Sequence, residues 1–120
     1  MSLFATPIDL YHVIKTAWSE ATCCDGWDAS NPCKNQCSVT ALAVHHFFGG
    51  DIMTTQTKGG KHFYNRIGDV YWDLAADQFD EPIPYSNTPS SMAEALADSS
   101  AAKLDILLRN IDAHDKVSAR

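Results

Sequence analysis

The segment Asn35–Phe48 constrains the fold most, because it is apolar nearly all round and ends at a pair of glycines. A segment of this length with so few polar positions predicts a helix buried at the centre of a domain. Asn35 can cap its start, and Gly49-Gly50 can end it because glycine tolerates the left-handed conformation that follows a helix. A central helix must be covered by other elements, and the rest of the chain is expected to supply them.

A helix is also expected near the amino terminus. Thr6 is a good N-cap, Pro7 suits the first helical position, and Asp9 completes a pattern that resembles a capping box. Apolar residues then recur at helical spacing at Leu10, Val13, Ile14, Ala17 and Trp18. The helix is expected to fade near Ala21. The segment Thr22–Gln36 is rich in Gly, Asp, Asn and Pro, which predicts a loop.

Three short strands are expected after the central helix, over Asp51–Thr57, Lys61–Ile67 and Val70–Ala75. Gly68-Asp69 between the last two favours a hairpin with a type II′ turn, because glycine occupies the first position of a two-residue loop. Alternation with a period of two places the following residues on one face of this hairpin: Phe63, Ile67, Val70, Trp72 and Leu74. That face is expected to pack on the buried helix.

The chain is expected to close with a Pro-rich loop over Glu81–Pro89 and helices over about Ser90–Ala97 and Ser100–Ala113. Its 120 residues suit a single domain, 1–120. The predicted fold class is α+β: a buried helix with a cysteine at its start packs on a small antiparallel three-stranded sheet, flanked by amino- and carboxy-terminal helices.

Charge and hydropathy exclude two kinds of partner. The net charge is −6, and the nine Lys and Arg residues are scattered without a cluster, which argues against binding nucleic acid through its phosphates. No apolar stretch approaches the roughly 18 residues of a membrane span. The start, Met1–Ala5, lacks the basic and apolar regions of a secretory signal. We therefore expect a cytoplasmic, reducing location with neither nucleic acid nor membrane as a partner.

Cys37 is expected in the first turn of the central helix. The positive end of the helix dipole and the unpaired backbone N–H groups there favour a thiolate. A free cysteine with a pKa of about 8.5 is only about 3% ionised at pH 7, so such a position suits a nucleophile. A buried cysteine that serves only packing is the alternative.

A nucleophilic thiol needs a base within hydrogen-bond reach, and His62 is the best candidate. His45 and His46 lie on the same helix as the thiol but about 12 Å along its axis. His12 is expected on the exposed side of a helix, and His114 near a fraying end. His62 begins the middle strand, next to a glycine turn that leaves room around it.

Asp73 is the residue expected to orient His62. If Ile67 pairs with Val70, Tyr64 pairs with Asp73, and the diagonal from His62 to Asp73 is about 7 Å between backbones. A carboxylate at that distance can fix the tautomer of an imidazole, as the third member of a triad does. This polar face lies opposite the apolar face of the hairpin, so the pair must lie at the sheet edge near the helix start. A shifted register is the alternative.

The order of Cys on a buried helix, His on a strand and Asp on the next strand resembles transglutaminase-like and papain-like proteins. His62–Asn65 followed by Trp72–Leu74 is similar to the aromatic strand and the Trp-Asp pair of the transglutaminase-like group. Residues 16–80 resemble the YunG-like family of small bacterial proteins more closely. This resemblance is carried by Asn31-Pro32, Gln36–Leu42, Phe48–Ile52, His62–Arg66, and Asp73-Leu74 through Gln78-Phe79. It implies the fold and a Cys-His-Asp arrangement, and it does not imply a substrate.

These residues predict an enzyme that transfers acyl groups by thiol chemistry, without a cofactor. Cys37 is expected to attack an amide, isopeptide or thioester carbonyl of a peptide or protein substrate, while His62 moves the proton and Asp73 orients His62. The backbone N–H of Cys37 and the side-chain amide of Gln36 or Asn31 are expected to hold the oxyanion. Tyr64, on the same face as His62, is expected to contact the substrate.

Three other interpretations remain at this point. Four thiols close in sequence could ligate a metal: Cys23, Cys24, Cys33 and Cys37. Their spacing fits zinc motifs poorly, so no metal is expected. A redox role in which Cys33 resolves an oxidised Cys37 is less favoured, because the usual two-residue spacer is absent. A non-catalytic binding module built on the same fold is the third possibility.

Overall fold

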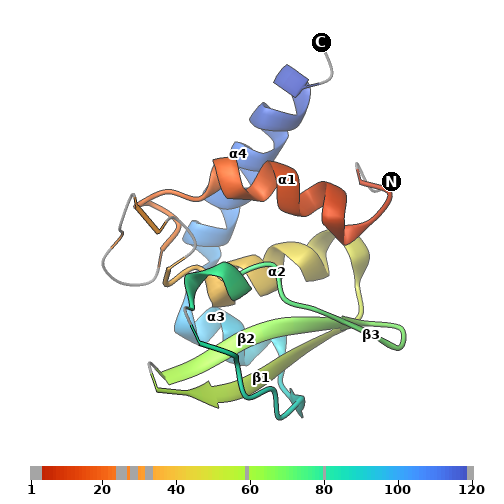
Figure 1. Ribbon diagram of the computed structural model, residues 1–120. Helices are drawn as coiled ribbons and strands as arrows, with labels where there is room; N and C mark the ends of the chain where they lie inside the picture. Colours follow the sequence, from red (N-terminus) through yellow and green to blue (C-terminus); the bar gives the residue numbers. More distant parts are fainter. Residues whose placement is uncertain are drawn as a thin grey trace.

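The computed structural model describes residues 4–23, 27, 30–31, 34–58, 60–79 and 81–118 of the chain. Within these ranges four helices and a short 3-10 helix accompany one sheet (Figure 1). The elements in chain order are α1 (Pro7–Ala17), α2 (Cys37–Phe48), β1 (Asp51–Thr57), β2 (Gly60–Ile67), β3 (Val70–Trp72), the 3-10 helix η1 (Ala76–Gln78), β4 (Thr88–Pro89), α3 (Met92–Asp98) and α4 (Ala101–Ser118). No helix in these ranges has both the length and the apolarity needed to cross a membrane.

Helix α1 starts as predicted and ends earlier than predicted. The Thr6 backbone N–H donates to Asp9 Oδ2 at 3.1 Å, which is one half of a capping box. The helix ends at Ala17 rather than near Ala21, because Trp18 adopts extended backbone angles. The buried Trp18 Nε1 instead donates to Thr40 Oγ1 on α2 at 2.8 Å, which ties the end of α1 to the central helix.

Helix α2 is the central helix that the sequence predicts. Its first eight residues, Cys37–Val44, are all buried. It begins at Cys37 rather than at Asn35, because Asn35 has a φ of 62°, which is incompatible with a right-handed helix. Gln36 is the N-cap instead. Gly49, with a φ of 71°, follows the last turn as expected.

Two apolar clusters lie on opposite sides of α2. The first joins α2 to α1 and α4; its most buried members are Leu10, Ile14, Val39, Ala43, Val44, Leu107 and Ile111. The second joins α2 to the sheet and α3; its members include Leu42, Ile52, Phe63 and Ala95. Figure 1 shows α2 between the α1 and α4 layer and the sheet. The cysteine-bearing helix is therefore shielded from water over most of its length.

The sheet is antiparallel with the order β3-β2-β1-β4, so the prediction of three strands is wrong. The fourth strand, Thr88–Pro89, pairs with Met53 and Thr54 of β1. It lies within the segment predicted as a loop from its proline content. Two residues with no alternation carry too little pattern to mark a strand, and proline is tolerated because β4 is an edge strand.

The hairpin between β2 and β3 has the predicted register at Ile67 and Val70. Gly68 has a φ of 59°, as the first position of a type II′ turn requires. Two details are corrected. β3 ends at Trp72 rather than Ala75, because the Ala75 backbone N–H donates to the Asp73 side chain in a turn. Val70 is 52% exposed rather than packed on α2, because it lies beside the turn at the tip of the hairpin.

The shortness of β3 determines where a site can form. β3 pairs only with residues 65–67 of β2, so the first half of β2, from Gly60 to Tyr64, has no strand beside it on that edge. Asn65, where the pairing begins, is buried and donates from Nδ2 to the Ala41 carbonyl of α2 at 3.0 Å. Side chains from α2 and from the segment after β3 can therefore reach around the open edge of β2.

Candidate functional site

His62 and Asp73 form a short, buried polar contact. His62 on β2 and Asp73, just after β3, are joined by a distance of 2.6 Å between His62 Nε2 and Asp73 Oδ2. Their side chains are 1% and 9% exposed. The predicted diagonal between the two residues is therefore present, and the alternative of a shifted register is excluded by the pairing of β2 with β3.

Asp73 fixes which nitrogen of His62 carries a proton. The carboxylate can only accept, so in the neutral imidazole Nε2 is the donor and Nδ1 is the acceptor. Asp73 is itself held by other donors: Tyr85 Oη donates to Oδ2 at 2.6 Å, and the Ala75 backbone N–H donates to Oδ1 at 3.2 Å. With its orientation fixed in this way, Asp73 leaves His62 Nδ1 available to accept a proton.

Tyr85 is held in its neutral form. Burial raises the pKa of Tyr85, and the hydrogen bond to Asp73 raises the pKa further because it needs the protonated phenol. Tyr85 lies in the segment 81–87, where the sequence carries no periodic pattern that could identify a site residue. Its role as a partner of Asp73 was therefore not predicted.

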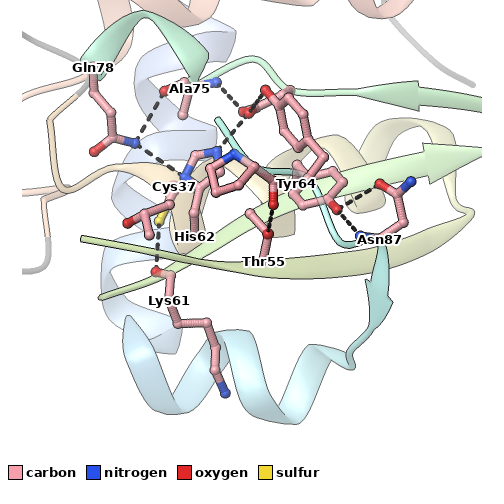
Figure 2. Close-up of polar contacts among 12 residues, drawn as sticks. Cys37, Thr55, Lys61, His62, Tyr64, Ala75, Gln78 and Asn87 are labelled. Atoms are coloured by element: carbon pink, nitrogen blue, oxygen red, sulfur yellow. Dashed lines mark hydrogen bonds and ion pairs between the residues drawn. The ribbon is translucent and has the colours of Figure 1, made fainter. Parts of the chain in front are cut away.

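Cys37 lies at the first position of α2 and is buried. Its sulfur is 4.0 Å from the Lys61 carbonyl oxygen, directly before His62 in β2. Cys37, His62 and Gln78 line the same cavity of about 460 Å³. Figure 2 shows Cys37 and Gln78 on the same side of the His62 ring. The cysteine and the histidine therefore line one cavity, although the faces of the hairpin suggest opposite sides.

Gln78 is a site residue that no pattern of single positions in the sequence indicates. Its Nε2 donates to the Ala75 carbonyl at 3.1 Å and lies 3.5 Å from His62 Nδ1. Its Oε1 accepts from the Asn35 backbone N–H at 3.3 Å. Gln78 therefore spans from η1 to the segment before α2. Gln78-Phe79 is one of the stretches that resemble the YunG-like family, and this resemblance is the only feature of the sequence that pointed to Gln78.

Phe79 covers the histidine ring. The two rings meet edge to face with their centroids 5.0 Å apart. Phe79 also lines the cavity that holds Cys37. An aromatic ring at this position excludes water from one side of His62, which strengthens polar interactions within the site.

The two amides predicted to bind an oxyanion are both engaged elsewhere. Gln36 is fully buried; its Nε2 donates to the Ser19 carbonyl at 3.0 Å and its Oε1 accepts from Thr22 at 2.8 Å. Asn31 Nδ2 donates to the Gln78 carbonyl at 3.2 Å. Neither residue lines the Cys37 cavity. In this structure Gln36 braces the start of α2, and Asn31 braces Gln78.

Tyr64 lines a different cavity from Cys37, with a volume of about 370 Å³. Its hydroxyl donates to Asn87 Oδ1 and accepts from the Asn87 backbone N–H, both at 2.7 Å. Burial raises the pKa of Tyr64, so this residue is also neutral. The prediction that Tyr64 shares the face of His62 is confirmed by their stacked rings, with centroids 6.1 Å apart.

The described part of the chain contains no group of three or more His, Cys, Asp or Glu side chains suited to a metal ion. Cys23 is a buried free thiol that donates to the Glu20 carbonyl at 3.4 Å. Cys24 and Cys33 lie outside the described residues. The interpretations of a four-thiol cluster and of a redox pair depend on these two cysteines, so both concern residues that the structure does not describe.

Comparisons with known proteins identify the family. The model of the YunG protein family matches residues 6–116. The chain is 35% identical over 103 residues to "Uncharacterized protein YunG" of Bacillus subtilis (strain 168), which covers 86% of this chain and 89% of that protein. No solved structure matches. The chain belongs to the YunG family.

Proposed function

We propose that this protein is a cysteine-dependent acyl-transfer enzyme built on a papain-like or transglutaminase-like core, with Cys37 as nucleophile, His62 as base and Asp73 as the positioning residue. One observation carries the proposal: the buried contact of 2.6 Å between His62 Nε2 and Asp73 Oδ2, which leaves Nδ1 of the same ring on the side of the cavity that Cys37 lines. A His–Asp pair that only contributes to a solvated surface would not require this burial, nor a carboxylate that accepts from three donors.

The first half of the reaction forms a thioester. His62 Nδ1 takes the proton of Cys37, and the sulfur attacks the carbonyl carbon of an amide, isopeptide or thioester. A carbon–sulfur bond forms as the carbonyl electrons move to oxygen. When the tetrahedral intermediate collapses, the bond to the amine or thiol leaving group breaks, and the leaving group takes the proton from His62 Nδ1.

The second half releases the acyl group. Water or an amine loses a proton to His62 Nδ1 and attacks the thioester carbon, and the Cys37 thiolate leaves and is reprotonated. Hydrolysis and transfer thus differ only in the acceptor. Asp73 stays ionised throughout; it holds the ring and stabilises the imidazolium. A peptide or protein amide remains the proposed substrate class.

The oxyanion donors are the Cys37 backbone N–H at the start of α2 and the Gln78 amide. Gln78 replaces Gln36 and Asn31 in this role because it lines the cavity with Cys37, whereas those two amides do not. Its Nε2 lies 3.5 Å from His62 Nδ1, in the cavity that Cys37 also lines. Loss of one such donor typically slows a reaction about 10²–10³-fold.

The alkylation rate of Cys37 tests the proposal. Iodoacetamide reacts with the thiolate, and peptide mapping separates the modification of Cys37 from that of the other three cysteines. We expect rapid modification below pH 7 in the wild type. His62→Ala should slow it up to about 100-fold at pH 6.5, where a thiol with the ordinary pKa of ~8.5 is about 1% ionised.

Lys34→Ala is the matched control, because Lys34 is exposed and lines the same cavity without contacting the His62–Asp73 pair. Cys37 in the Lys34→Ala variant should be alkylated at a rate within about twofold of the wild type, because the substitution changes the local charge only slightly. A Cys37 that reacts with the pH profile of a free thiol in the wild type, unchanged by His62→Ala, would contradict the proposal.

A further inference from the structure

A second cavity lies on the other side of Asp73 from the thiol. It has a volume of about 370 Å³ and is walled by Tyr64, Tyr71, Trp72 and Tyr85, with Asp73 at one side. We call it the tyrosine pocket. It shares no described lining residue with the Cys37 cavity. The roles of Cys37 and Gln78 therefore do not explain it.

The rings of the tyrosine pocket are set at angles to one another. The Tyr64 and Tyr85 rings meet edge to face at 73°, with centroids 5.0 Å apart. The Tyr64 and Tyr71 centroids are 6.4 Å apart at 53°. Tyr64 is buried, whereas Tyr71 and Tyr85 are 45% and 44% exposed. Tyr64 thus contacts both of the more exposed rings, and the three rings line one open cavity.

The electrostatics of the pocket favour a cation. Aromatic ring faces carry negative potential, and Asp73 is the one ionisable acid or base among the non-tyrosine residues described as lining the pocket. The Tyr64 and Tyr85 hydroxyls stay neutral because burial raises the pKa of each. The Tyr71 ring already accepts a cation from a residue that does not line the pocket, because the Arg66 guanidinium carbon lies 5.8 Å from its centroid.

We propose that the tyrosine pocket binds an alkylammonium group, such as the end of a lysine side chain or a small organic amine. The partly exposed Tyr71 and Tyr85 rings supply cation–π contacts, and the Asp73 carboxylate supplies the opposite charge at the wall. This binding needs no thiol chemistry. If the proposed acyl transfer holds, an amine bound here lies on the Asp73 side of the catalytic pair.

Choline is a suitable probe because its neutral carbon isostere has the same shape without the charge. Binding is followed by nuclear magnetic resonance, through the indole N–H of Trp72 as each compound is added at up to tens of millimolar. We expect choline to shift this signal and to bind about fivefold to tenfold more tightly than the isostere, as one good cation–π contact provides. N-acetyl-lysine methylamide tests whether a lysine side chain is also accepted.

A pair of variants at one exposed position tests the rings. Tyr71→Phe keeps the aromatic face and should retain choline binding, whereas Tyr71→Leu should weaken it about fivefold. Cys37→Ala should bind choline like the wild type, so a failure of the acyl-transfer proposal is separable from a failure of this one. Equal affinity for choline and the isostere, no shift at Trp72 with either, or equal binding by the two Tyr71 variants would overturn the proposal.

Discussion

At the scale of single residues, the site depends on one carboxylate with several partners. Asp73 accepts hydrogen bonds from His62, from Tyr85 and from the Ala75 backbone N–H. His62 and Asp73 could be predicted from the sequence because both lie on a hairpin whose turn fixes the register. Tyr85 and Gln78 could not, because they come from irregular segments where no periodicity links position to direction. The same holds for Gln36, whose amide turned out to face the loop before α2.

Asp73→Asn tests the positioning role directly. The amide can donate to His62 and so permits the tautomer with the proton on Nδ1, which cannot act as the base. We expect alkylation of Cys37 at pH 6.5 to slow by at least about tenfold while the fold is retained. Alkylation at the wild-type rate, with an unchanged circular dichroism spectrum, would show that Asp73 does not act through His62.

Tyr85→Phe tests the coupling of the phenol to Asp73. The pKa of Tyr85 is raised in the folded protein above the ordinary value of 10.0. Its contribution to stability is therefore fully present below pH 10 and is lost as the pH rises toward the folded-state pKa. Urea denaturation at pH 9, 10 and 11 should show a steeper loss of stability in the wild type than in Tyr85→Phe. Parallel slopes would contradict the assignment.

At the scale of elements, the junction between α2 and β1 fixes where the helix meets the sheet. Gly50 has a φ of 77°, and a Cβ there would lie 2.4 Å from the Arg66 backbone oxygen. Gly49 has a similar φ of 71° with open space around it. The glycine pair was predicted as a helix end, which is correct. The close approach of β2 to Gly50 was not predictable, because it depends on how the strand packs after the turn.

These adjacent glycines form a matched pair of variants. Gly49→Ala should cost about 1–2 kcal/mol, the ordinary strain of a left-handed alanine. Gly50→Ala adds a clash with backbone that cannot move aside, and we expect it to cost at least about 3 kcal/mol or to prevent folding. Thermal or urea denaturation of the two variants measures the difference. Equal destabilisation would show that the approach of Arg66 is looser than described.

At the scale of the whole molecule, the buried central helix was the most predictable feature and the sheet edges were the least. The long apolar run of α2 has no alternative to burial, and both apolar clusters form around it. The ends of the strands were harder to predict from the sequence, because β4 is two residues long and β3 is three. The short β3 leaves the edge of β2 open beside His62, so the cavity that Cys37 and His62 share could be explained only from the fold.

A truncation in the cluster between α1, α2 and α4 should separate stability from site geometry. Leu107→Ala on α4 removes a fully buried side chain far along the chain from the site and should cost about 2–5 kcal/mol. The alkylation profile of Cys37 in the protein that remains folded should be unchanged. Val70→Ala, at a position that is 52% exposed, is the control and should cost less than about 1 kcal/mol. A Leu107→Ala variant as stable as the Val70→Ala control would contradict the described core.

The most direct test of the central claim is whether an acyl group can be trapped on Cys37. The protein is mixed briefly with p-nitrophenyl acetate, quenched in acid and analysed by intact mass and peptide mapping. We predict one acetyl group, held as a thioester on Cys37, that forms much more slowly in His62→Ala and Asp73→Asn and is absent at this position in Cys37→Ala. Acetylation spread over lysines, or on Cys37 at the same rate in all the histidine and aspartate variants, would contradict the account.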